Sequence, residues 1–127
     1  MKRQAQKGPS QRQLRAGELV RHALAEILRT EDIDDPALEG ESVSILEVRM
    51  SPDLQHATVY TSSLTGKDTD ALAGALNRHQ KFLRGGLARR IELKYIPDLV
   101  FRGDHAAEAA GRIEELLRSP DVARDLK

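Results

Sequence analysis

The stretch "SVSILEVRMSPDLQHATVYTSS" at residues 42–63 decides the fold. Two runs rich in β-branched residues flank the segment "SPDLQ" in its middle, as the strands of a hairpin flank their turn. Pro52 and Asp53 suit the centre of a type I turn. We therefore predict a β-hairpin that pairs residues 42–51 with residues 56–63.

The first strand of this hairpin does not alternate cleanly between apolar and polar residues. Val43 and Ile45 fall on one face, whereas Leu46, Val48 and Met50 fall on the other. A β-bulge would reconcile the two halves, and so would burial on both faces near the start of the strand.

A helix is expected on each side of the hairpin. Before it, apolar residues recur at spacings of three and four over residues 11–30, and Ser10 can cap the helix. After it, a second helical pattern follows, which Asp68 or Thr69 can cap. Its apolar stripe consists of Leu72, Leu76, His79, Leu83, Leu87 and Ile91.

The C-terminal part adds one strand and one helix. Pro97 precedes "DLVF" (98–101) and can open a strand without removing a hydrogen bond from its middle. Residues 105–119 form a last short helical pattern. The predicted class is α+β, a three-stranded sheet with helices packed on one face. We expect one domain at 11–118, a flexible basic tail at 1–10 and a C-terminal tail at 119–127.

Composition and motifs argue against several classes of protein. The chain has 127 residues and no cysteine, which excludes disulfides and thiolate metal sites and fits the cytoplasm. It has no apolar run near the roughly 18 residues of a membrane span. No nucleophile or phosphate-loop motif is present, so we expect no enzyme and no cofactor.

His22 and Glu26 lie one helical turn apart, a weak sign of a metal-dependent enzyme. His79 lies in an apolar stripe and is expected to be partly buried and hydrogen-bonded.

The net charge of zero hides a strong segregation of charge along the chain. Residues 1–30 hold seven basic and two acidic side chains, and residues 76–94 hold six basic and one acidic. Between them, residues 31–55 hold one basic and eight acidic side chains. Such blocks create local fields that can attract a polyanion.

The second basic block contains "RHQKFLRGGLARR" at residues 78–90, a helical pattern with two adjacent glycines. By helical phase, Arg78, Lys81, Gly85 and Arg89 share the face opposite the leucines. The glycine pair has three interpretations: a hinge that frees backbone N–H groups, a smooth patch that a phosphate backbone can approach, or neutral drift. The first two favour a polyanion.

The candidate binding residues follow from this pattern. Because exposed aromatic residues are scarce, recognition of charge and shape fits better than base readout, and structured RNA suits that mode. The expected phosphate partners are Arg78, Lys81, Arg84, Arg89, Arg90 and Lys94. Gly85 and Gly86 would allow close approach, and Arg12 and Arg15 form a second patch.

The order helix–strand–strand–helix–helix–strand resembles a type II KH domain. Several short motifs, in the same order and spacing, resemble bacterial ribosome-binding factor A over about residues 11–118. They include Asp35-Pro36, Val43-Ser44-Ile45, Ser51-x-Asp53-Leu54, Ala57-x-Val59-Tyr60, Phe82-Leu83-Arg84 and Pro97-x-Leu99-x-Phe101-x-x-Asp104.

This resemblance implies a non-catalytic, monomeric factor that binds the immature small (30S) ribosomal subunit and its 16S rRNA. It also implies a role in late maturation near the 5′ end of the rRNA and in growth in the cold. The family carries Ala-x-Gly at a helix kink, where His79, Gln80 and Lys81 stand in this chain. Because that motif is missing, we predict that the chain breaks near Gly85-Gly86 instead. An alternative is a KH-like protein-interaction module that binds through the acidic segment 31–55.

Overall fold

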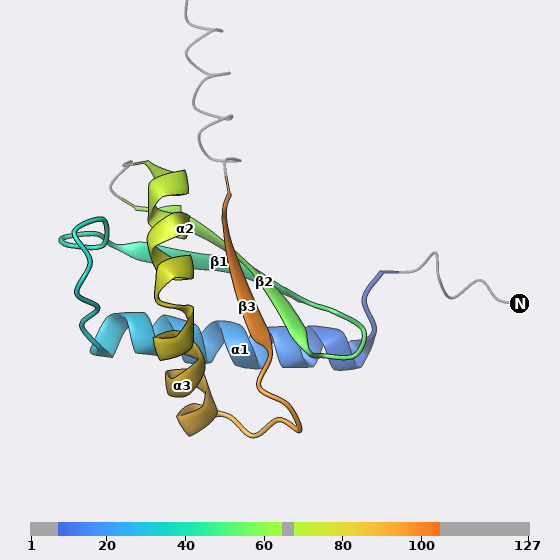
Figure 1. Cartoon of the computed structure of the whole chain (residues 1–127). Coiled ribbons are helices and arrows are strands. Elements are labelled where there is room, and N and C mark those ends of the chain that lie inside the picture. The colour runs from blue at the N-terminus through green and yellow to red at the C-terminus, as the bar shows by residue number, and fades with distance from the viewer. Residues whose placement is uncertain (1–7, 65–67, 105–127) are drawn as a thin grey trace, which may run out of the picture.

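The computed structural model describes residues 8–64 and 68–104 and shows the predicted order of helices and strands (Figure 1). The elements are α1 (Gln11–Thr30), β1 (Val43–Met50), β2 (His56–Ser63), α2 (Thr69–Arg78), α3 (Gln80–Arg90) and β3 (Asp98–Gly103). The helix predicted at 105–119 and the C-terminal tail lie outside the described residues, as do residues 1–7.

The three strands form one mixed sheet in the order β1-β2-β3. The predicted hairpin is confirmed, because β1 and β2 pair antiparallel. The register shifts between Ile45 and Glu47, which favours the bulge over the alternative of burial on both faces. The Leu54 N–H donates to the Ser51 carbonyl at 2.9 Å, which closes a turn centred on Pro52 and Asp53 as expected. Strand β3 pairs parallel to β2, and α2 and α3 form the crossover that parallel pairing requires.

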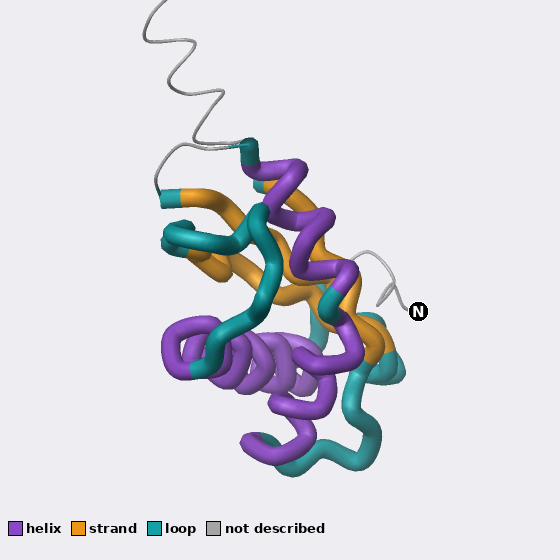
Figure 2. The backbone as a smooth tube through the Cα atoms, turned by 60° about the vertical axis from the view of Figure 1, so that its left-hand side comes forward, coloured by secondary structure: helices purple, strands orange, loops and turns teal. Residues whose placement is uncertain are grey.

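The described helices pack on one face of the sheet, as predicted (Figures 1 and 2). Helix α1 lies against β1, and α2 lies against β2 and β3. Burial alternates along the strands accordingly: Val59 and Phe101 are buried beneath the helices, whereas Arg49, Val100 and Arg102 are exposed on the outer face. The sheet therefore has one covered face and one face that the described helices leave open.

The first two helices begin at the predicted caps. The Ser10 hydroxyl accepts a hydrogen bond from the Gln13 N–H, and the Gln13 side chain accepts one from the Ser10 N–H, which forms a capping box. The Asp68 carboxylate accepts hydrogen bonds from the N–H groups of Asp70 and Ala71 and so caps α2. These caps fix where the helices start relative to the sheet.

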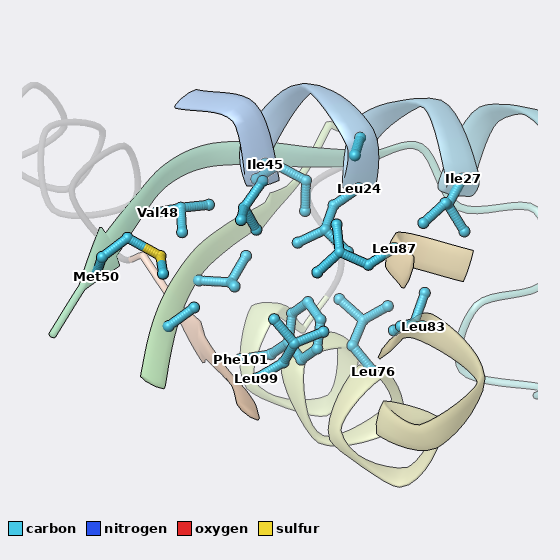
Figure 3. Packing of buried hydrophobic residues seen from close by; sticks show 14 of the residues in the cluster. Leu24, Ile27, Ile45, Val48, Met50, Leu76, Leu83, Leu87, Leu99 and Phe101 are labelled. Carbon is cyan, nitrogen blue, oxygen red and sulfur yellow. The ribbon is translucent and has the colours of Figure 1, made fainter. Parts of the chain in front are cut away.

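A single aliphatic core joins the three helices to the sheet (Figure 3). Figure 3 shows side chains from α1, the sheet and the α2–α3 pair pointing toward one another. The fully buried members with the largest side chains are Leu24, Ile27, Leu76, Leu83, Leu87 and Leu99. Phe101 is the aromatic residue among the buried members of this core, which is otherwise built from aliphatic side chains.

Two glycines allow unusually close packing around α1. A Cβ atom on Gly17 would lie 2.6 Å from the carbonyl oxygen of Val48 in β1. A Cβ atom on Gly86 would lie 3.0 Å from the Cδ1 atom of Ile27. Gly17 therefore sets the distance between α1 and β1, and Gly86 sets the distance between α1 and α3.

Candidate nucleic-acid interface

The long helical pattern after the hairpin is interrupted at His79, which ends α2 and precedes α3. Its backbone, with φ −107° and ψ 24°, leaves the helical region. The His79 N–H donates to the Leu76 carbonyl at 3.1 Å, and the His79 carbonyl accepts from the Leu83 N–H at 3.0 Å. Figure 2 shows this break as a short loop-coloured step between two helices.

The prediction that the chain breaks near Gly85-Gly86 is therefore wrong. Both glycines lie within the continuous helix α3. Gly86 is buried against Ile27, so its missing side chain serves helix packing and not bending. The break lies where the comparison with the family motif would place it, although Ala-x-Gly is absent there.

The break is held from outside the helix by Asp35, which lies in the loop between α1 and β1. The buried Asp35 carboxylate accepts hydrogen bonds from both Nε and Nη2 of Arg78, and its Oδ2 atom lies 3.0 Å from the Nε2 atom of His79. It also accepts from the Ala37 N–H. The Ala37 N–H, followed by His79 and Arg78, lowers the pKa of Asp35. The carboxylate is thus charged and fixes both residues at the helix break.

His79 behaves as its place in the apolar stripe predicted. Its side chain is 28% exposed and contacts the Asp35 carboxylate. At the same break, α3 begins with no side-chain hydrogen bond to its first turn from the described residues. The first backbone N–H groups of α3 therefore lack a side-chain cap, and they lie at the positive end of this helix's dipole.

Three of the arginines that were predicted to bind phosphate already contact other groups of the protein. Arg78 pairs with Asp35, although its side chain remains 60% exposed. Arg84 donates to the backbone carbonyls of Ile96 and Pro97 and so ties α3 to the segment before β3. Arg90 is 21% exposed and pairs with Glu26 and Glu31. Arg84 and Arg90 thus serve mainly to hold α3 against its neighbours.

Two other predicted partners are exposed and have no acidic partner within the described residues. Lys81 and Arg89 lie on α3, eight residues apart and therefore on one face of the helix. Gly85 lies between them, and a Cβ atom there would have only the Arg89 Nη1 atom nearby, at 3.7 Å. Lys94 is exposed just beyond α3, with its Nζ atom 5.5 Å from the centre of the Tyr95 ring.

The predicted second patch is exposed but lies some distance away. Arg12 and Arg15 are on the first turns of α1, whereas α3 contacts α1 at Ile27. Twelve or more residues at a rise of about 1.5 Å place the two patches roughly 20 Å apart along the helix. One phosphate therefore cannot bridge them, although a longer nucleic acid can.

Sequence reasoning missed the side chains that cap the free edge of the sheet. Asn77 donates to the Phe101 carbonyl and accepts from the Phe101 N–H, at 2.9 and 2.8 Å. Gln80 accepts from the Leu99 N–H at 3.2 Å. These amides lie on the polar side of their helices and were indistinguishable from solvated residues. They satisfy backbone groups of β3 that would otherwise be open to another strand.

Sequence reasoning also missed two exposed aromatic rings. Phe82, in the first turn of α3, is 39% exposed, and Tyr95 is 50% exposed. The rings lie next in sequence to the exposed cations Lys81 and Lys94. Exposed rings beside cations offer faces on which unpaired bases can stack.

The proposed metal pair does not form a metal-binding group in the described part of the chain. His22 lies near Glu18 and Arg21, whereas Glu26 pairs with Arg90 and Arg29. Residues 8–64 and 68–104 contain no group of three His, Cys, Asp or Glu residues that could hold a metal. Within those same ranges, no helix is both long and apolar enough to span a bilayer.

The mixed sheet and the broken helix beside β3 define an α+β domain of KH-like type. A family model for ribosome-binding factor A matches residues 12–117. The chain is 55% identical over 124 residues to ribosome-binding factor A of Phenylobacterium zucineum, covering 98% of this chain and 86% of that protein. It is also 55% identical over 122 residues to the factor of a Bradyrhizobium species, covering 96% and 88% of the two chains. The chain belongs to the ribosome-binding factor A family.

Solved structures of this family share the fold. The crystal structure of ribosome-binding factor A from Thermus thermophilus superposes with a TM-score of 0.60 at 26% identity, covering 72% of this chain and 94% of that chain. A homology model of the Thermus factor, fitted into the cryo-EM map of a 30S complex, superposes with a TM-score of 0.57 at 28% identity, covering 71% and 92%.

Proposed function

We propose that this protein binds the immature small ribosomal subunit by placing the exposed cations of α3 against rRNA phosphates. The observation that carries the proposal is the arrangement at α3. Lys81 and Arg89 lie on one face of a rigid helix, exposed and without an acidic partner among the described residues. Because neither cation must break an internal ion pair first, both can neutralise phosphates at little cost.

The break at His79 strengthens this site. It places the uncapped N-terminus of α3 beside Lys81 and the half-exposed guanidinium of Arg78. Backbone N–H groups at a helix N-terminus favour phosphate binding. The contact between the Asp35 carboxylate and His79 keeps the break in one geometry. In this proposal Gly85 is the smooth surface between the two cations, whereas buried Gly86 has no direct contact with RNA.

The remaining predicted residues take two roles. Lys94 extends the cationic face beyond α3, and Arg12 and Arg15 contact a separate part of the rRNA. Arg84 and Arg90 act as positioning residues, because their donors are already used by backbone carbonyls and by carboxylates. Phosphates position the domain, and Phe82 and Tyr95 give unpaired rRNA bases a surface for stacking.

The family comparison supports the small subunit as the partner, since the Thermus relative was fitted into a 30S complex. We extend the proposal to a monomeric, cytoplasmic, non-catalytic factor that assists late maturation near the rRNA 5′ end and supports growth in the cold. The proposed domain is residues 11–118.

A binding experiment tests this function. The full-length protein is incubated with purified small subunits and, in parallel, with large subunits, over a series of salt concentrations. We expect binding to the small subunit that weakens steeply with salt, because released counterions drive it. Absence of binding to small subunits at every salt concentration, or equal binding to both subunits, would contradict the proposal.

A further inference from the structure

A groove with acidic walls lies beside α1 and reaches Arg90 and Ile91 at the end of α3. Its volume is about 1210 Å³, and it runs between the C-terminal half of α1 and the loop at 31–42. We call this hollow the acidic groove, and it is lined by large aliphatic residues and by carboxylates. The large aliphatic residues of the lining are Leu19, Leu28, Ile33, Leu38, Val43, Leu64 and the buried Ile91.

The lining of the groove leaves aliphatic surface in contact with water. Leu19 is 42% exposed and Leu64 is 71% exposed, whereas Ile91 is buried. The partly buried members are Leu28, Ile33, Leu38 and Val43. A single exposed leucine is ordinary on a protein surface, but several large aliphatic side chains around one hollow are typical of a contact surface.

The walls of the groove carry a large excess of negative charge. Seven carboxylate residues line it against two arginines, Arg29 and Arg90. Both arginines are already paired, with Glu26 and Glu31. Asp32, Asp34 and Glu39 are exposed and have no basic partner within the described ranges. The groove therefore repels a phosphate backbone and attracts a cation.

We propose that the acidic groove binds a basic segment of another protein on the small subunit, with aliphatic side chains of that segment against Leu19 and Leu38. This proposal rests on the proposed function, because it assumes that the protein is bound to the small subunit. The protein would then lie between rRNA at α3 and a ribosomal protein at the groove. Charge complementarity selects a Lys- or Arg-rich partner, and the aliphatic lining selects one with large apolar residues.

The chain's own termini fit this groove less well than a separate partner does. Residues 105–127 hold five acidic and four basic side chains and thus have no positive excess. Residues 1–7 hold three basic side chains, but Met1 is their one large apolar residue. Neither terminus supplies both the positive charge and the aliphatic residues that the groove presents.

Site-specific photocrosslinking tests the proposal. The full-length protein carries p-benzoylphenylalanine in place of Leu19, or in place of Val100 on the outer sheet face as the matched control, and is bound to purified small subunits. We expect the probe at position 19 to crosslink a Lys- or Arg-rich segment of one small-subunit protein, and the probe at position 100 not to do so. Asp34→Lys should lower the yield per bound protein at least about threefold, whereas Glu47→Lys on the outer face should leave it unchanged.

The outcomes separate this inference from the proposed function. If the protein binds small subunits but position 19 crosslinks rRNA, the chain's own termini, a second copy, a segment without positive charge or nothing, the inference is wrong and the function stands. An unchanged yield in Asp34→Lys would also overturn it. If no small-subunit binding is seen, both fail together.

Discussion

Replacing Gly85 with alanine should stabilise the protein, because Gly85 lies inside a helix and has room for a methyl group. Glycine is about 1 kcal/mol less favourable than alanine in a helix interior. The new methyl group would have the flexible end of Arg89 as its nearest neighbour, at 3.7 Å, so no steric cost offsets the gain. We expect Gly85→Ala to raise the free energy of unfolding by about 0.5 to 1 kcal/mol.

The adjacent glycine provides a matched control. A Cβ atom on Gly86 would lie 3.0 Å from Ile27 Cδ1 and 3.3 Å from Ile27 Cγ1, so the same gain in helix propensity is opposed by crowding in the core. Gly86→Ala should therefore be less stable than Gly85→Ala. Equilibrium unfolding in urea of the wild type and both variants, monitored by circular dichroism, measures the three free energies of unfolding.

A loss of stability in Gly85→Ala would refute this reasoning. A destabilised variant would mean that residue 85 adopts a backbone conformation that alanine resists, as at a hinge. Equal effects of the two substitutions would contradict the assignment of Gly86 to the contact with α1. Only the first result would return the helix break to Gly85-Gly86, the position that the sequence alone suggested.

Three further predictions concern other contacts. Gly17→Ala should lower the free energy of unfolding by about 1 to 2 kcal/mol, because its Cβ atom would lie 2.6 Å from the backbone oxygen of Val48; urea unfolding would show no loss if α1 can shift freely. Asp35→Asn should destabilise the protein at neutral pH. The folded state lowers the pKa of Asp35 below its ordinary 3.8. The contribution of Asp35 to the free energy of unfolding is therefore present above that value and is lost as the pH falls through the lowered pKa. A difference in this free energy between wild type and variant that did not change from pH 7 to 2 would contradict the assigned role. Asn77→Asp should cost about 0.5 to 1.5 kcal/mol, since the donor to the Phe101 carbonyl is lost; thermal unfolding identical to that of the wild type would argue against edge capping.

The sequence predicted the fold well where local signals and tertiary packing agree. The hairpin turn at Pro52-Asp53, the bulge near Ile45 and the cap at Ser10 all follow from local chemistry, and the structure contains each of them. These features depend on neighbours within a few residues, which a sequence displays directly.

The helix break could not be placed from the sequence because its cause is distant. Asp35 lies more than forty residues before His79, and its carboxylate holds the break by hydrogen bonds across the fold. Glycine content pointed to Gly85-Gly86, but Gly86 is required by Ile27, which is even more distant in sequence. Tertiary contacts thus overrode the local propensity.

The candidate site was predicted as a set of cations, but the structure divides the set. Arg84 and Arg90 are indistinguishable from Lys81 and Arg89 in the sequence pattern, and only their partners separate them. The exposure of the Phe82 and Tyr95 rings could not be predicted either, because an aromatic residue in a short chain can lie in the core or on the surface.

The proposal that Lys81 and Arg89 contact rRNA phosphates is tested most directly by the salt dependence of small-subunit binding. The double variant Lys81→Ala, Arg89→Ala is compared with the wild type and with Arg102→Ala, which removes an exposed cation from the outer sheet face. If both residues contact phosphates, the slope of log affinity against log salt should shrink by about 1.5 in the double variant and stay unchanged in Arg102→Ala. An unchanged slope and affinity in the double variant would contradict the proposed interface.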